Sequence, residues 1–333
     1  MVLPDRAGLL RCGRGLEGVE ATIPAPLRPS SRIIRAAAWG VVATGAVVPL
    51  VRRRLRLPVP VVTVASTAAP VALCVALRRT PARDVGTCAL QMWAYLAHYE
   101  MPNDDHDRLL SRVRVDYPVR VDRVLGLGEL PGARLQRLLG RPGVGLRGPE
   151  QALVWCHWLW FLVPHGTLAY ILARRPERFE RAALHTYAVF DVGLVGYWAL
   201  PTAPPWYAAQ HGRAPEMRRM MVEHGETFWK HRWAPLYRSL AGNPLAAMPS
   251  LHFATSVMAA RLLAEEGRTH AAVGWTYAGA LGFALVYLGE HYVVDLLAGL
   301  VLTEGVRRSA GRAAPLLRAV GRRVQALEGA AHG

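Results

Sequence analysis

Residues 33–51 read IIRAAAWGVVATGAVVPLV, and residues 57–77 read LPVPVVTVASTAAPVALCVAL. Each run is close to the roughly 20 apolar residues that carry a helix across a bilayer. Further apolar stretches recur toward the C-terminus, at 151–173, 182–200, 249–264, 271–289 and 292–306. We therefore predict an all-α, polytopic transmembrane helical bundle with about 6–8 membrane segments. A soluble bundle of buried helices is the competing interpretation of the same runs.

Composition agrees with a folded, apolar chain. The protein has 333 residues, of which 52% are hydrophobic, and a formal net charge of +16. This apolar fraction excludes a disordered chain. The four cysteines are scattered, with no CxxC pair, so neither a disulfide framework nor a structural zinc site is expected.

The positive charge could indicate nucleic-acid binding, but its distribution favours a membrane. Lys230 is the only lysine among the 40 basic residues, and many arginines stand in short clusters beside apolar runs. Basic clusters at the ends of apolar runs orient membrane proteins. We therefore expect no nucleic-acid partner, and the oligomeric state stays open.

Charge also predicts orientation. The arginine-rich residues 307–333 indicate a cytoplasmic tail, which places 201–248 on the extracytoplasmic face of a multi-pass cell-membrane protein. The N-terminal half is ambiguous, because basic clusters at 52–56 and 78–83 flank one apparent span. A membrane-dipping segment at 85–101 would change the parity.

Five regions follow from these patterns. We expect an N-terminal tail (1–32), N-terminal membrane segments (33–101), an interfacial amphipathic region (102–150), a membrane core (151–306) and the basic cytoplasmic tail (307–333). The arginine-rich stretch 102–150 is predicted to form short helices on the membrane surface. A soluble cap is the alternative.

Two short motifs carry the chemistry. Pro249-Ser250-Leu251-His252 opens one apolar run, and His291-Tyr292-Val293-Val294-Asp295 opens another. The chain between them goes down one span and up the next, so both histidines should reach the same membrane face. His291 and Asp295 are four residues apart and share a helix face, so the carboxylate can orient the imidazole.

Two histidines at one depth suit phosphoryl transfer, in which one attacks phosphorus and the other protonates the departing oxygen. A Ser–His–Asp hydrolase is disfavoured, because Ser250 and His252 point to different sides of a helix. A zinc site from His252, His291 and Asp295 has suitable ligand types but lacks a helical HxxxH pairing. A separation of several ångströms between the two rings across one polar pocket would fit in-line transfer through phosphorus.

These motifs resemble a known family. AAMPSLHFATS (246–256), followed 39 residues on, histidine to histidine, by LGEHYVVDLLAG (288–299), is similar to the type 2 phosphatidic acid phosphatase superfamily. The Leu251 form of the first motif and PTAPPW at 201–206 look most like its inositol phosphorylceramide synthase, or inositolphosphotransferase, branch. The resemblance covers residues 150–306.

The resemblance implies specific roles. His291 is the implied nucleophile that forms a phosphohistidine, Asp295 orients it, and His252 is the acid for the leaving group. Ser250 is the implied ligand of phosphate oxygens. No metal and no cofactor are implied.

The usual phosphate-binding cations of the family are missing. The family's lysine has Arg-Pro seven residues on, whereas Lys230 has Tyr237 there, and Leu285 stands where an arginine is usual. Phosphoryl transfer needs its developing charge matched. The predicted substitutes are Lys230, Arg232 and Arg238.

The predicted activity is therefore transfer or hydrolysis of a phosphate group on a lipid. With water as the acceptor the protein would be a lipid phosphatase, and with a polyol it would be a phosphotransferase. The alternative is a non-enzymatic membrane transporter or scaffold, in which the His and Asp side chains relay protons or only pack.

Overall fold

The computed structural model describes residues 29–140, 145–240 and 242–333, and leaves aside the side chains of residues 29, 30 and 238–240. Within these ranges the chain is α-helical, and its only β-type pairings are isolated bridges. The all-α prediction is therefore confirmed. The predicted tail 1–32 falls almost entirely outside the described residues.

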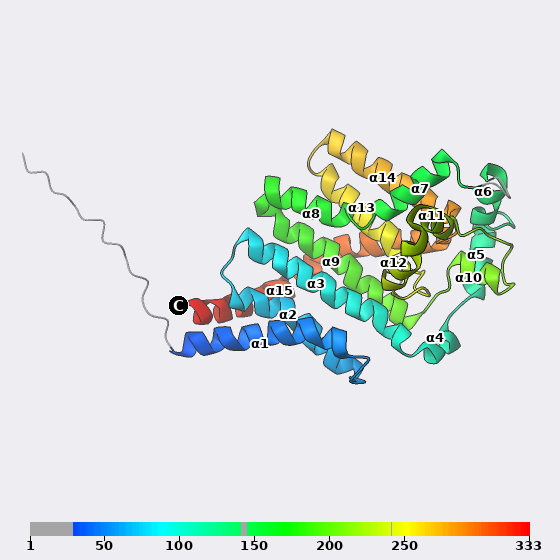
Figure 1. The fold of residues 1–333 in the computed structure, drawn as a ribbon. Coiled ribbons are helices and arrows are strands. Elements are labelled where there is room, and N and C mark those ends of the chain that lie inside the picture. Colours follow the sequence, from blue (N-terminus) through cyan, green and yellow to red (C-terminus); the bar gives the residue numbers. More distant parts are fainter. Residues whose placement is uncertain (1–28, 141–144, 241) are drawn as a thin grey trace, which may run out of the picture.

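Three N-terminal helices pack in sequence order: α1 (Pro29–Val51), α2 (Val59–Ala76) and α3 (Pro81–Glu100) (Figure 1). Among the described residues, Ser31–Val51 and Val59–Ala76 are the helices long and apolar enough to cross a membrane. The predicted number of spans therefore stays a prediction.

The hydropathy of residues 151–173 suggested one helix, but the stretch is interrupted. It forms α7 (Gly148–Leu159) and α8 (Val163–Arg174), separated by a turn. Pro164 explains the break, because its ring carries no N–H and would clash with the carbonyl of Trp160 in a continuous helix. The break leaves α7 against α14, while α8 packs on α9 and α13.

The core of the bundle surrounds α13 (Leu251–Ala264), which contacts α8, α9 (Pro176–Ala199), α14 (Arg268–Tyr287) and α15 (Val293–His332). Small and apolar residues occupy every side of α13, and most of its side chains are buried. A helix without a polar face must be enclosed by other helices or by lipid. The motif histidine on α13 therefore enters the interior of the bundle.

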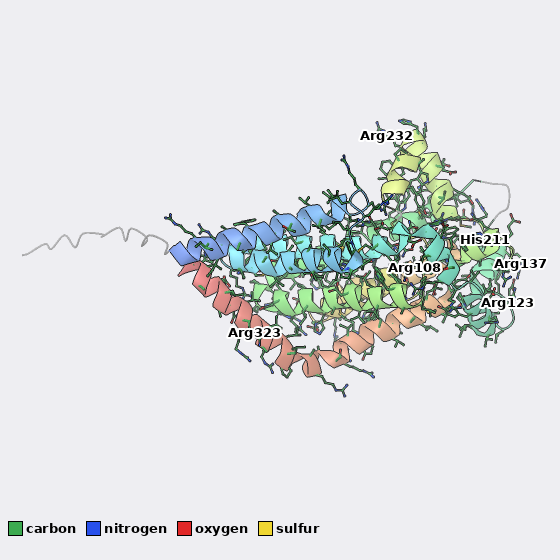
Figure 2. The ribbon with its side chains drawn as sticks, turned by 90° about the horizontal axis from the view of Figure 1, so that it is seen from below. Arg108, Arg123, Arg137, His211, Arg232 and Arg323 are labelled. Atoms are coloured by element: carbon green, nitrogen blue, oxygen red, sulfur yellow. The ribbon has the colours of Figure 1, made fainter. Side chains whose placement is uncertain are left out.

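The last helix is much longer than the predicted span 292–306. α15 has 40 residues and continues through the basic tail to His332. It contains Pro315, and Figure 2 shows the helix bending between its orange and red parts. Its C-terminal end reaches the helical hairpin that α1 and α2 form, where His332 Nε2 lies 3.1 Å from the Val75 carbonyl oxygen.

Short helices gather at the end of the bundle where α13 and α15 begin (Figure 1). Residues 102–140 contribute most of η1 (Met101–Asp104), then α4 (His106–Arg112), α5 (Asp116–Leu125) and α6 (Pro131–Leu139). Residues 205–240 contribute α10 (Pro205–Gln210), α11 (Met220–Trp229), η2 (Lys230–Arg232) and α12 (Trp233–Leu240). Together these helices form a cap over the two motifs.

Helices α13 and α15 cross closely at Gly299. A Cβ atom added there would lie 2.7 Å from the Ser250 carbonyl oxygen, whereas one added at Gly305 of the same helix would meet nothing within 4 Å. A contact below 3.0 Å with backbone forces the two helices apart. Glycine at 299 therefore sets the distance between the two motif helices.

We predict opposite effects for two glycine substitutions in α15. Gly299→Ala should lower the stability of the purified protein in detergent by about 1–3 kcal/mol, because it overpacks the crossing. Gly305→Ala should leave stability unchanged or raise it by about 0.5–1 kcal/mol, because alanine is the better helix former. Thermal melting of both variants checks this, and equal melting temperatures would contradict the close crossing.

Candidate active site

A tight turn delivers the second motif to the start of α15. After α14 ends at Tyr287, Gly289 takes a φ of +82°, which favours glycine, and the His291 N–H donates to the Leu285 carbonyl at 3.0 Å. A Cβ at Gly289 would also lie 3.0 Å from the Arg218 carbonyl oxygen. His291 is thereby held against the end of α14, and its side chain is buried.

The first motif begins α13 and is joined to the second through the backbone. Ser250 is the N-cap of α13, and its hydroxyl oxygen accepts the Phe253 N–H at 3.4 Å. The Ser250 N–H donates to the Asp295 carbonyl oxygen at 3.0 Å. Ser250 is fully buried and does not line the cavity described below. Its observed contacts are those of a helix cap, and phosphate binding by Ser250 stays a prediction.

The structure brings His252, His291 and Asp295 into one chain of contacts. His291 Nδ1 lies 3.2 Å from Asp295 Oδ2, and His291 Nε2 lies 3.3 Å from His252 Nδ1. Asp295 is fully buried, and the same Oδ2 accepts the Tyr292 N–H at 2.9 Å. The predicted convergence of the two motifs is therefore present in the structure.

The two histidine rings lie next to each other. Their nearest nitrogens are 3.3 Å apart, within hydrogen-bonding distance, and their centroids are 5.4 Å apart. Direct contact lets the buried His291 ring and the partly buried His252 ring satisfy one N–H and one lone pair.

The contacts also assign the hydrogens. A carboxylate can only accept, so His291 carries its hydrogen on Nδ1 and presents a lone pair at Nε2. His252 Nδ1 must then be the donor in the contact between the rings. The nitrogen suited to attack thus faces an N–H suited to protonate a leaving group.

Both histidines open onto a cavity of about 330 Å³. Its wall is largely aromatic, with contributions from α7 and from the cap helices. The aromatic side chains are those of Tyr99, Trp155, Trp158, Phe161, Trp206, Trp229, Trp233 and Tyr237. A few polar groups in a mostly apolar wall are typical of a site for an organic ligand.

Among the side chains that the structure describes, Arg219 is the cation that lines this cavity. Its guanidinium carbon lies 3.8 Å from the centroid of the Trp206 ring, and its Nη2 donates to the Tyr237 hydroxyl at 2.5 Å. The backbone beside it is fixed by Gln136 of α6, which accepts the Arg218 N–H at 2.8 Å and donates to the Arg218 carbonyl at 2.9 Å.

Two of the three predicted cations are not brought to the cavity. Lys230 and Arg232 lie in η2, which has no buried residue, and neither lines the cavity. Figure 2 shows Arg232 at the tip of the cap, pointing away from the bundle. The side chain of Arg238 lies outside the described part of the structure.

Other polar residues that line the cavity do not belong to either of the two sequence motifs. His157 of α7 has its ring centroid 4.9 Å from that of His252, and Asn243 is almost fully buried. His157 Nδ1 and Asn243 Nδ2 are buried and make no hydrogen bond with any described residue. A histidine inside an apolar run was an available signal for His157, whereas nothing local distinguished Arg219 or Asn243.

Glu290 also lines the cavity and pairs with the cation. Its Oε1 lies 3.5 Å from Arg219 Nε. Burial raises the pKa of Glu290, and the nearby Arg219 and His291 oppose that rise. Glu290 is therefore part of the cavity wall rather than a surface carboxylate.

Fold and site define a helical bundle with a paired-histidine centre under an aromatic cap. Residues 151–306 match the family model described as the PAP2 superfamily. The resemblance predicted from the two motifs is confirmed, and this segment is similar to membrane lipid phosphatases and phosphotransferases.

Two curated relatives agree with the predicted branch. The chain is 32% identical over 152 residues to "Phosphoinositol dihydroceramide synthase" of Bacteroides thetaiotaomicron, covering 42% of this chain and 48% of that protein. It is 28% identical over 157 residues to "Inositol phosphorylceramide synthase" of Candida albicans, covering 44% and 33%. The match thus spans less than half the length of either relative. No solved structure matches the chain significantly.

We predict that Arg219 dominates anion binding in the cavity. Vanadate should quench the fluorescence of the tryptophans in the wall, and Arg219→Gln should weaken its binding about 10–100-fold, because hydrogen bonds to charged groups contribute about 1.5–3 kcal/mol. Arg219→Lys should bind with an affinity between those of the wild type and Arg219→Gln. Arg232→Gln removes an exposed arginine and is the matched control. Equal vanadate affinities for the two glutamine variants would contradict the assignment.

Proposed function

We propose that the protein is an integral membrane lipid phosphatase or phosphotransferase that works through a phosphohistidine at His291. The observation that carries the proposal is the chain of contacts from Asp295 through His291 to His252 at the wall of the cavity. It aligns an oriented nucleophile with a proton donor. Similarity to the PAP2 superfamily supports the same chemistry.

In the first step the lone pair of His291 Nε2 attacks phosphorus, and the bond from phosphorus to the leaving oxygen breaks. His252, protonated as the imidazolium, passes one proton to that oxygen, which departs as an alcohol and leaves His252 neutral. Asp295 stabilises the positive charge that forms on His291. Arg219 balances the charge on the phosphoryl oxygens.

In the second step a hydroxyl group attacks the phosphorus, the bond from phosphorus to His291 Nε2 breaks, and His252 takes the proton of the hydroxyl. With a phosphate monoester as donor, water releases inorganic phosphate. With a phosphodiester as donor, an alcohol acceptor becomes a new phosphodiester. The names of the two relatives favour transfer of an inositol phosphate group to a ceramide-type lipid. We therefore favour an inositolphosphotransferase with a lipid phosphodiester as donor.

The reaction requires the two rings to separate. The attacking nitrogen must stand about 3–3.5 Å from phosphorus, and the donor about 2.7–3 Å from the leaving oxygen. The nitrogens are 3.3 Å apart, so the phosphoryl group enters by displacing the His252 ring. His252 is the mobile partner, because His291 is held by Asp295 and by the turn that precedes α15.

The exterior of the helices supports a membrane setting. Large apolar side chains stand exposed along several helices, among them Val47, Leu50, Val64, Val71, Val192, Val195, Val273 and Val301. Soluble monomers seldom expose so much apolar surface. We place the protein in the cell membrane, with the basic half of α15 toward the cytoplasm and the cavity at the extracytoplasmic face.

Removal of the nucleophile tests the proposal. With a phosphoinositol lipid labelled with ³²P in the headgroup phosphate, the purified protein should acquire an acid-labile label, and His291→Ala should abolish both labelling and turnover. His211→Ala, which removes an exposed histidine of the cap, should retain activity. Activity that survives His291→Ala would remove the proposed nucleophile, and an inactive wild-type protein would favour the transporter or scaffold alternative.

Removing His252 should slow formation of the phosphohistidine more for a poor leaving group than for a good one. His252→Ala should slow formation of the phosphohistidine from a lipid alkyl ester about 10²–10⁴-fold, the usual contribution of a general acid. The burst from a 4-nitrophenyl phosphodiester should fall much less, because nitrophenolate leaves without a proton. Rapid-quench measurements compare the two, and equal losses would show that His252 is not the acid.

A further inference from the structure

The catalytic helix α15 is held by a carboxylate from outside the matched segment. Asp122 lies in α5 and is almost fully buried. Its Oδ1 accepts the Val294 N–H at 2.9 Å, and its Oδ2 accepts the Val293 N–H at 3.1 Å. These two residues stand between His291 and Asp295 in the chain.

Asp122 completes the hydrogen bonding of the first turn of α15. The first N–H groups of a helix have no partner within it, and a buried one must find an acceptor elsewhere. The Tyr292 N–H donates to the Asp295 side chain, and the Asp295 N–H donates to the Tyr292 carbonyl. The N–H groups of Val293 and Val294 donate to the Asp122 carboxylate instead. The turn is thus shared between two carboxylates, and only one of them touches His291.

The position of Asp122 is itself well fixed. Its neighbour Val119 packs in an apolar cluster with Leu130, Ala133 and Tyr292, which joins α5 and α6 to the start of α15. Burial raises the pKa of Asp122 to about 6, while the N–H groups of Val294 and Val293 hold it down. At pH 7 the group is therefore mainly the carboxylate, which can accept both bonds.

We propose that Asp122 is a positioning residue that aligns His291 for attack by anchoring the first turn of α15. The inference rests on the proposed phosphohistidine function. Without Asp122, two partly buried N–H groups would compete for the remaining carboxylate of the turn, Asp295. That competition would draw Asp295 away from His291 Nδ1, and the nucleophile would lose its orientation.

Kinetics of detergent-purified full-length variants test the role. Asp122→Ala should lower kcat roughly 10–100-fold, as loss of a group that orients a ligand usually does, while KM stays within about twofold because the substrate contacts are intact. Asp122→Asn keeps one acceptor oxygen and should lose less. Asp116→Asn, which removes an exposed carboxylate from the same helix, is the matched control.

The amount of folded protein, measured by size-exclusion chromatography, separates positioning from stability. A kcat that is normal per folded molecule in both Asp122 variants would overturn the inference, as would an equal loss in Asp116→Asn. If the wild type is active, His291→Ala is inactive and Asp122→Ala is normal, this inference fails and the proposed function stands. An inactive wild type overturns both.

Discussion

The arrangement of the site depends on one buried carboxylate. Asp295 holds the His291 ring through Oδ2, accepts the Tyr292 N–H with the same atom, and receives the Ser250 N–H on its backbone carbonyl. Burying a charge is costly unless it is hydrogen-bonded. The bonds to Oδ2 offset part of that cost, while Oδ1 is buried with no hydrogen bond to any described residue. All three bonds tie Asp295 to a part of one of the two motifs. Asp295 therefore orients the nucleophile through its side chain and links α13 to α15 through its backbone carbonyl, while Gly299 sets how closely the two helices cross.

The cap explains why two motifs alone do not make this site. α5 supplies Asp122 to the start of α15, and α6 supplies Gln136 to the backbone beside Arg219. Both helices lie outside the segment that matches the family model. The N-terminal half of the chain thus contributes to the walls and supports of the cavity, and Tyr99 of α3 reaches it too.

Sequence spacing predicted the parts of the site that lie on regular helices. The separation of His252 from His291 equals one span down and one span up, and Asp295 lies one turn beyond His291, so both relations follow from helix geometry. Arg219 obeys no such rule, because its place depends on Trp206 and on Gln136. Lys230 is closer to the first motif in sequence but lies in η2, away from the cavity. Closeness in sequence to a motif does not predict a site residue where tertiary contacts determine the course of the backbone.

The N-terminal arginines show the same limit. Arg52 is buried and pairs with Glu100 and Asp104, both at 2.8 Å, so the loop after α1 lies at the same end as Tyr99 and the cavity. At the other end, Arg83 pairs with Glu328 of α15. The two clusters that flank α2 therefore lie at opposite ends of the bundle, each with acidic partners from distant segments. An arginine neutralised by an ion pair contributes little to the orientation of a membrane protein. A rule that counts charges near apolar runs does not take account of acidic partners from distant segments.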